Sequence, residues 1–138
     1  MSLFLLRLLL DFGLVVLIWI IQLVVYPSFN YYGREQLLEW HEKYTTRITF
    51  VVMPLMLGQL VVAGIQLWIS PSWYTIGSMG IIVLLWLSTF LQFVPLHGRI
   101  SDGDFTEATL VELVRKNWVR TFLWTLLFLL GVVLDEGN

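Results

Sequence analysis

The stretch that decides the fold is residues 48–69, ITFVVMPLMLGQLVVAGIQLWI, in which no side chain is charged. A helix needs roughly 20 apolar residues to cross about 30 Å of hydrocarbon, and this stretch has that length. Three further apolar stretches share its character: residues 3–26, 76–96 and 119–134. The sequence therefore predicts four membrane-spanning helices.

The overall composition agrees with a membrane class. Hydrophobic residues make up 58% of the 138-residue chain and charged residues 13%, about half the charge of an ordinary soluble domain. A membrane β-barrel would show alternating segments of about ten residues, whereas these runs are continuous and longer. We expect an all-α fold, an integral membrane antiparallel four-helix bundle that forms a single transmembrane domain.

The expected spans are residues 3–26, 36–69, 76–97 and 105–134. The second helix should project into the cytoplasm by a couple of turns, because no strong breaker except Pro54 interrupts it and each residue adds about 1.5 Å. Pro54 and Pro95 should kink their helices. The first stretch lacks a cleavage site of small residues and is expected to stay as an anchor.

Basic residues set the expected orientation. Four spans place the N-terminus, the loop around residues 70–78 and the C-terminus on one side, where only Arg7 is basic. The opposite side holds the other basic residues: Arg34, Lys43, Arg47, Arg99, Arg115, Lys116 and Arg120. The positive-inside rule then predicts an inner (cytoplasmic) membrane protein with both termini outside. The net charge of -2 argues against a nucleic-acid partner.

Candidate functional residues gather at the cytoplasmic mouth of the expected bundle. Both histidines, His41 and His97, fall there, and Arg120 lies deepest, where its charge is costly unless it is paired or holds a ligand. These three are the candidate catalytic residues, since histidine titrates near neutral pH. The candidate ligand-binding residues at the same level are Asn117, Tyr44 and Glu112. Alternatively, these side chains are ordinary interfacial anchors and surface ion pairs.

The absence of cysteine restricts any metal site to other ligands. His41 and His97 could be axial ligands of a haem or chlorin, or could bind iron or zinc together with Glu39 or Glu112. No HxxxH or ExxH pair supports this interpretation.

Polar residues also occur within the apolar stretches. Gln22, Gln59 and Gln92 are expected to form hydrogen bonds between helices. An intramembrane carboxylate such as Asp11 is a functional hypothesis by default, but Arg7 lies one turn away and could neutralise it.

Two segments carry a family resemblance: FVPLHGRI at residues 93–100 and NWVRT at residues 117–121. They resemble the paired signature of the anthrone-oxygenase-like family of small four-helix membrane proteins. The resemblance implies that Pro95, Asn117 and Arg120 form a shared framework. It also implies cofactor-independent oxygenation of a polycyclic phenolic ketone. At His97 this chain departs from the family, which more often has an amide residue.

Three functions therefore stay open. The first is a site that binds or oxidises a hydrophobic ring compound, with Arg120 and Asn117 holding a carbonyl or phenolate and a histidine moving the proton. The second is a haem, chlorin or metal protein. The third is a non-enzymatic subunit or assembly factor of a larger membrane complex.

Overall fold

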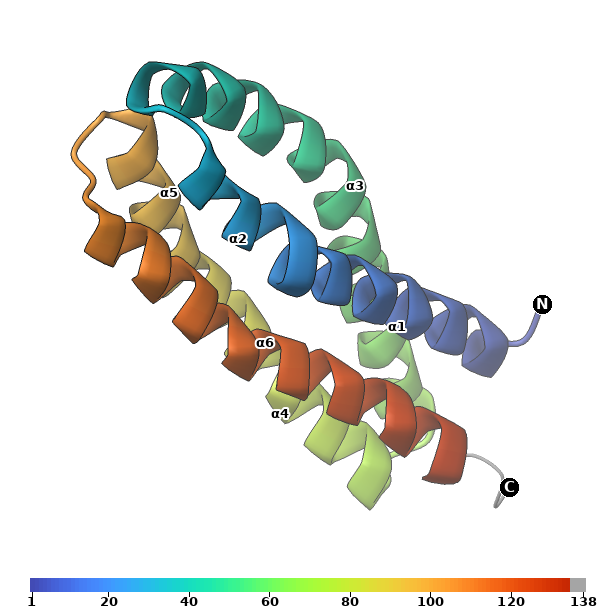
Figure 1. Cartoon of the computed structure of the whole chain (residues 1–138). Coiled ribbons are helices and arrows are strands. Elements are labelled where there is room, and N and C mark those ends of the chain that lie inside the picture. Colours follow the sequence, from blue (N-terminus) through green and yellow to red (C-terminus); the bar gives the residue numbers. More distant parts are fainter. Residues whose placement is uncertain (135–138) are drawn as a thin grey trace.

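The computed structural model describes residues 1–134, and every regular element among them is helical (Figure 1). The elements are α1 (Leu3–Ile20), the π-helical turn η1 (Ile21–Val25), α2 (Tyr26–Ser28), the 3₁₀ turn η2 (Phe29–Tyr31), α3 (Arg34–Ile69), α4 (Trp73–Ser88), the π-helical turn η3 (Thr89–Phe93), α5 (Val94–Ser101) and α6 (Glu107–Leu134). Joined end to end they form four long helical rods, at residues 3–31, 34–69, 73–101 and 107–134.

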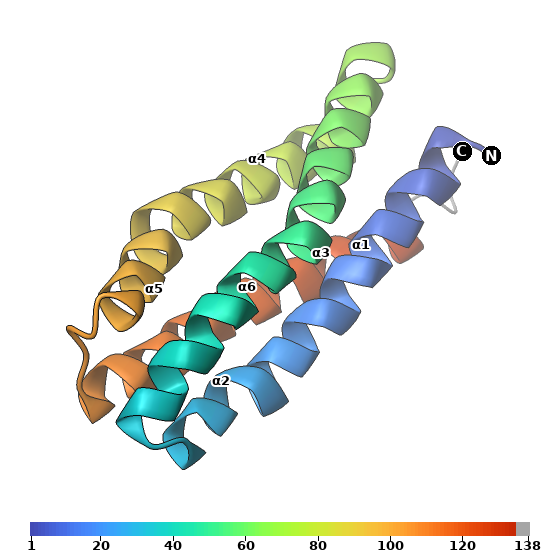
Figure 2. The same ribbon diagram turned by 90° about the horizontal axis from the view of Figure 1, so that it is seen from above.

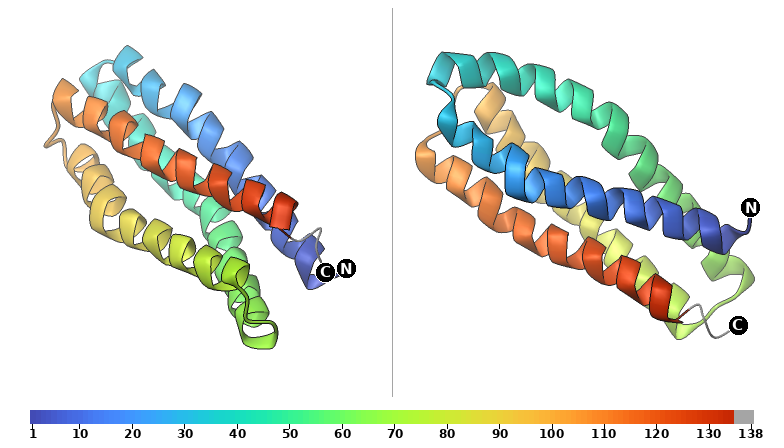
Figure 3. Two further views of the ribbon diagram at one scale, coloured as in Figure 1. Left: turned by 90° about the horizontal axis from the view of Figure 1, so that it is seen from below. Right: turned by 45° about the vertical axis from the view of Figure 1, so that its right-hand side comes forward.

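The four rods pack in a ring. α1 contacts α3 and α6, and α4 contacts the same two helices. Residue 1 and the turn at residues 70–72 lie at one end of the molecule, here called the terminus end, together with the end of α6 (Figure 2). The turns at residues 32–33 and 102–106 lie at the opposite end, here called the loop end (Figure 3).

All four rods are long and apolar enough to cross a membrane, as the sequence predicts. Large apolar side chains cover their outer faces: Phe50, Leu91 and Phe122 are 78%, 71% and 64% exposed. Soluble monomers rarely expose apolar surface continuously, because such surface is costly in water. The composition of the outer faces therefore favours an apolar surrounding.

The π-helical turns η1 and η3 occupy equivalent places before Pro27 and Pro95. Each turn ends two residues before its proline. A proline lacks the N–H that would bond the carbonyl four residues earlier, and its ring crowds that carbonyl. A π turn widens the helix locally and relieves this conflict, and such turns are frequent at functional sites. Pro54 differs, since α3 continues through it as an unbroken α-helix.

Polar side chains fix the connections between rods. Ser72 and Thr75 form a reciprocal capping box that starts α4, a device worth about 1 kcal/mol. At the loop end, Arg34 Nη1 donates to the Phe105 carbonyl at 3.1 Å, and the guanidinium lies 4.5 Å from the centre of the Phe105 ring. This contact ties the start of α3 to the segment that precedes α6.

Candidate functional site

A chain of hydrogen bonds at the loop end joins four side chains. His41 Nε2 lies 2.8 Å from His97 Nδ1, and His41 Nδ1 lies 3.0 Å from the hydroxyl of Ser101. On the other side, His97 Nε2 lies 3.0 Å from the hydroxyl of Tyr26. The order is therefore Tyr26, His97, His41, Ser101. Both histidines, which the sequence predicts at the same end of the bundle, are therefore in direct contact.

Three segments of the protein position these four hydrogen-bonded side chains. Tyr26 follows η1, His41 lies on α3 seven residues after its start, and His97 and Ser101 lie one turn apart on α5. The ring of Phe29 packs edge-on against His41 at 5.7 Å, and His41 and Tyr26 are both buried. Packed aromatic rings hold each imidazole in one orientation, so the hydrogen bonds are preorganised.

Arg120 reaches the same group from α6. Its guanidinium and the Tyr44 hydroxyl both interact with the hydroxyl of Tyr26. The guanidinium also lies 4.1 Å from the centre of the Phe93 ring, and its Nη2 atom donates to Thr89 Oγ1 at 3.3 Å. Arg120 is thus buried at a point where η3 presents both an aromatic face and a hydroxyl group.

The Nε atom of Arg120 is buried without a hydrogen-bond partner. An unsatisfied donor of this kind is costly in a protein interior and calls for an explanation. Arg120 lines a cavity of about 460 Å³, so a ligand oxygen in that cavity would lie beside the guanidinium.

The cavity lies between α3 and the helical rod formed by α4, η3 and α5. Its inner wall carries the polar groups of Tyr26, Tyr44, His97, Ser101 and Arg120. The remaining wall is mainly apolar or carries threonine: Ile21, Thr45, Ile48, Thr49, Val52, Met53, Thr89, Phe90, Phe93, Val94 and Gly98. Phe90 and Val94 are 52% and 54% exposed, so the cavity reaches the outer face of the rods. Both rods bend along this side of the molecule (Figure 2).

The structure does not bring Asn117 and Glu112 into this cavity. Asn117 is fully buried on α6 and donates to Gln22 Oε1 at 2.9 Å, which joins α6 to η1. Glu112 forms an ion pair with Lys116 at 2.7 Å on the partly exposed face of α6. Of the six residues predicted from sequence, His41, His97, Tyr44 and Arg120 meet, while Asn117 supports the helix packing and Glu112 lies apart.

A metal or haem site finds little support in this geometry. No group of three or more His, Asp or Glu side chains within residues 1–134 is arranged to hold a metal ion. Axial nitrogens on opposite sides of a haem iron, each about 2 Å from it, would lie roughly 4 Å apart. The observed separation is 2.8 Å, so the hydrogen bond between the rings would have to break.

A second polar network fills the terminus half of the bundle. Arg7 Nε lies 2.9 Å from both carboxylate oxygens of Asp11, and its Nη1 atom donates to Gln66 Oε1 at 3.3 Å. Gln59 joins them by donating to Asp11 Oδ1 at 2.6 Å. Arg7 and Asp11 are fully buried, so the pair neutralises two charges that neither side chain could carry alone in this environment.

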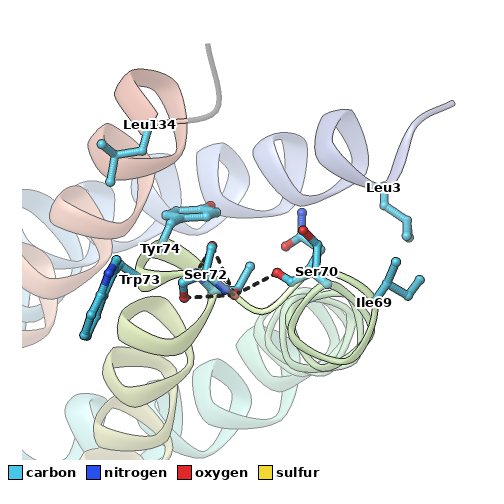
Figure 4. Close-up of a pocket in the computed structure, with 9 residues that line it drawn as sticks. Leu3, Ile69, Ser70, Ser72, Trp73, Tyr74 and Leu134 are labelled. Atoms are coloured by element: carbon cyan, nitrogen blue, oxygen red, sulfur yellow. Dashed lines mark hydrogen bonds between the residues drawn. The ribbon is translucent and has the colours of Figure 1, made fainter. Parts of the chain in front are cut away.

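Close to this network a hollow of about 440 Å³ opens at the terminus end (Figure 4). Gln66 lines it, along with Ser70, Ser72 and Tyr74. The dashed bonds in Figure 4 join Thr75 to Ser70 and to Ser72, and the Ser72 and Thr75 side chains hold the capping box that starts α4. These hydroxyl groups are therefore engaged in starting a helix.

Sequence reasoning gave Ser101 no role and did not connect Thr89 or Phe93 to Arg120. Serine and threonine within or beside apolar helices ordinarily bond to their own backbone, so their presence alone carries no signal. The spacing of Thr89, Phe93 and His97, four residues each, was a usable signal, because residues at i, i+4 and i+8 share one helix face.

Comparisons with models of known protein families, with curated proteins and with solved structures found no match for this chain.

Proposed function

We propose that this chain is an integral membrane protein whose four rods are antiparallel spans, and that it binds a hydrophobic ring compound with a phenolic hydroxyl or carbonyl group. The ligand occupies the cavity between α3 and the α4–α5 rod. One observation carries this proposal: a 460 Å³ cavity with mainly apolar walls ends at Arg120, Tyr26 and His97.

The cavity suits such a ligand in size and chemistry. Ligand pockets are commonly 300–1,000 Å³ in volume, with apolar walls and a few polar groups that fix orientation. Phe90, which lines the cavity and is 52% exposed, offers a ring against which a flat ligand can pack. Arg120 offers a charged donor for a carbonyl or phenolate oxygen, and its unpartnered Nε atom supports this role.

The ligand is proposed to enter sideways from the hydrocarbon phase. Phe90 and Val94 are exposed at the outer edge of the cavity, in rods that are long and apolar enough to span a bilayer. The distribution of basic residues supports an orientation in an inner membrane with the loop end in the cytoplasm and both termini outside.

A filled-cavity variant tests the proposal. A Cβ atom added at Gly98 would meet no atom within 4 Å, and Gly98 lines the cavity. Gly98→Phe should therefore fill the cavity without disturbing the helices. Gly77, on α4 near the terminus end, is equally open, so Gly77→Phe is the matched control.

The probe is 2-naphthol, whose fluorescence reports binding to the detergent-solubilised protein. We expect saturable binding to the wild type and to Gly77→Phe, and at least a tenfold weaker affinity for Gly98→Phe, equivalent to about 1.4 kcal/mol. Arg120→Gln should weaken binding comparably, whereas Arg99→Gln, on the exposed face of α5, should not. Equal binding by Gly98→Phe and the wild type would refute the proposed site.

Anthrone is the second probe, because the family resemblance implies oxidation of such a ring ketone. One anthrone and one O₂ would give one anthraquinone and one water. Uptake of oxygen in equal amount with anthraquinone would extend the proposed function from binding to oxidation.

A further inference from the structure

We propose that Tyr26, His97, His41 and Ser101 form a proton relay between the cavity and an acidic hollow at the loop end. Ser101 connects the two spaces, since it lines both the 460 Å³ cavity and a separate hollow of about 500 Å³. The inference rests on the proposed ligand site, because the relay needs a proton donor or acceptor in the cavity.

The chemistry of neutral imidazole determines which group donates in each hydrogen bond of the relay. One ring nitrogen of a neutral histidine carries hydrogen and donates, while the other accepts. If Tyr26 donates to His97 Nε2, then His97 Nδ1 must donate to His41 Nε2, and His41 Nδ1 must donate to Ser101. If Ser101 donates to His41 instead, every bond in the chain points the opposite way.

Moving one proton converts the first arrangement into the second. A ligand hydroxyl gives its proton to the Tyr26 oxygen, and Tyr26 passes its own proton to His97 Nε2. His97 releases the Nδ1 proton to His41 Nε2, and His41 releases the Nδ1 proton to Ser101. Ser101 gives its former proton to the hollow, so one proton leaves and the ligand becomes an anion. No atom of the four side chains is lost or gained.

Charged and hydroxyl groups around the relay favour this direction. Arg120 from α6 and Tyr44 from α3 both face the Tyr26 hydroxyl, and Arg120 lies where a ligand anion would form. A fixed positive charge stabilises a developing negative charge without reorganising solvent. The same charge disfavours a proton that remains on His97 and so promotes its onward transfer.

The far end of the relay opens onto carboxylates. The hollow that contains Ser101 is also lined by Glu39, Glu42 and Asp102. Glu39 pairs with Lys43 at 2.6 Å. Ser101 is exposed, and the three acidic residues are exposed as well. Exposed carboxylates exchange protons with water and can accept one from the Ser101 hydroxyl.

Ser101→Ala separates the relay from ligand binding. The variant removes the last hydroxyl of the chain but keeps Tyr26 and Arg120 at the ligand. Wild type and variant are both compared at saturating 2-naphthol, so a change in affinity does not enter the readout. Excited 2-naphthol is an acid whose neutral and ionised forms emit at different wavelengths, so the emission ratio reports proton release from the bound probe.

The relay predicts that Ser101→Ala lowers emission from bound naphtholate at least tenfold, a modest loss on the scale of general acid–base effects, roughly 10²–10⁴. Ser101→Thr should restore emission because it restores the hydroxyl. Ser88→Ala, which removes a hydroxyl that bonds Gln92 outside the site, is the matched control. Unchanged emission from Ser101→Ala saturated with 2-naphthol would overturn the relay and leave the ligand site standing.

A second measurement needs no ligand in the cavity. The chain has two histidines, so ¹⁵N-histidine NMR in lipid resolves both rings without ambiguity. Exchange between the two donor arrangements should be detected for the wild type and slowed by Ser101→Ala. If 2-naphthol fails to bind the wild type, the proposed function fails. A single fixed tautomer at both rings, insensitive to Ser101→Ala, overturns the relay by itself.

Discussion

The Nε2 atom of His41 and the Nδ1 atom of His97 lie 2.8 Å apart, although 56 positions separate the two residues in the chain. A hydrogen bond of this length requires that one nitrogen carry hydrogen and the other carry a lone pair. The pair therefore holds at most one extra proton while the bond persists. It also locks α3 to α5 at the level of the cavity.

The first prediction concerns this bond directly. ¹⁵N-labelled histidine should show a scalar coupling between the two imidazole rings in lipid-embedded protein. His41→Ala should abolish the coupling and cost about 1–3 kcal/mol in the free energy of unfolding, because a buried ring nitrogen of His97 loses its partner. Lys43→Ala, which breaks an exposed ion pair two residues away, should cost much less, because water screens that pair. A wild-type spectrum without the coupling contradicts the bond.

The second prediction concerns the buried pair of Arg7 and Asp11. Asp11→Asn should lower the free energy of unfolding by about 3–5 kcal/mol, since it leaves a buried guanidinium without its counter-charge. Unfolding in mixed micelles of mild detergent and dodecyl sulfate would measure the loss. Replacing both residues by leucine should cost less than Asp11→Asn alone.

The control for Asp11 is Glu112→Gln, which breaks the partly exposed pair with Lys116. Its cost should be a small fraction of the Asp11→Asn cost because water screens the pair. Similar losses for Asp11→Asn and Glu112→Gln would show that the Arg7 environment is hydrated rather than dry.

The third prediction concerns the shape of the Arg120 head group. Arg120→Lys keeps the charge but loses the flat guanidinium that lies 4.1 Å from Phe93 and 5.1 Å from Trp124. We expect a loss of about 1–2 kcal/mol in stability, the size of a desolvated cation–π contact. Thermal unfolding in detergent measures it, with Arg115→Lys on the exposed face of α6 as the control. A lysine that substitutes without loss would show that charge alone matters.

The fourth prediction concerns the π turn η3. A π turn carries one residue more than a regular helix needs, so deleting Leu91 should convert it to α-helix and keep the flanking faces aligned. Deleting Phe122 in α6 should rotate one part of the helix by about 100° relative to the other and unfold the protein. Both residues are exposed, so neither deletion removes core packing. Thermal unfolding in detergent compares the two deletion variants. An equal loss of thermal stability in both would contradict the assignment of the π turn.

The fifth prediction concerns orientation in the membrane. The chain lacks native cysteine, so single cysteines can be introduced freely. Tyr31→Cys at the loop end and Trp73→Cys at the terminus end replace side chains that are 91% and 93% exposed. In intact cells, an impermeant maleimide should label Trp73→Cys, while Tyr31→Cys should react only after lysis. Labelling of both in intact cells would contradict the proposed orientation.

The four long helices are predictable from sequence because their signal is local. The length of each apolar stretch can be read directly from the sequence. Beyond their apolar parts, α3 extends as a continuous helix to Arg34 and α6 to Glu107. The π turns are harder to predict. A disturbance near Pro95 follows from its missing N–H, but the sequence does not show whether the helix widens into a π turn, as it does before Pro95, or continues as an α-helix, as it does through Pro54.

The members of the candidate site were predictable in part. His41, His97 and Arg120 were recognisable as candidates because histidine and arginine are rare within or beside long apolar stretches. Glu112 lies outside the candidate site. Its spacing from Arg120 along α6 gives its height in the bundle, but it does not show that the side chain turns toward Lys116. Gln22 and Gln59 bond between helices as expected, yet Gln92 faces outward and bonds Ser88. Which side of a helix packs inward depends on tertiary contacts that composition does not encode.

The open edge of the cavity at Phe90 and Val94 changes what affinity means for this protein. Under the proposed function, a compound that enters there from a bilayer would be counted per lipid molecule and not per volume of buffer. Partitioning would concentrate it before it meets Arg120, so a weak intrinsic site would be filled at low total dose. Dilution with empty vesicles should therefore strip the compound from the protein even when the water volume stays constant.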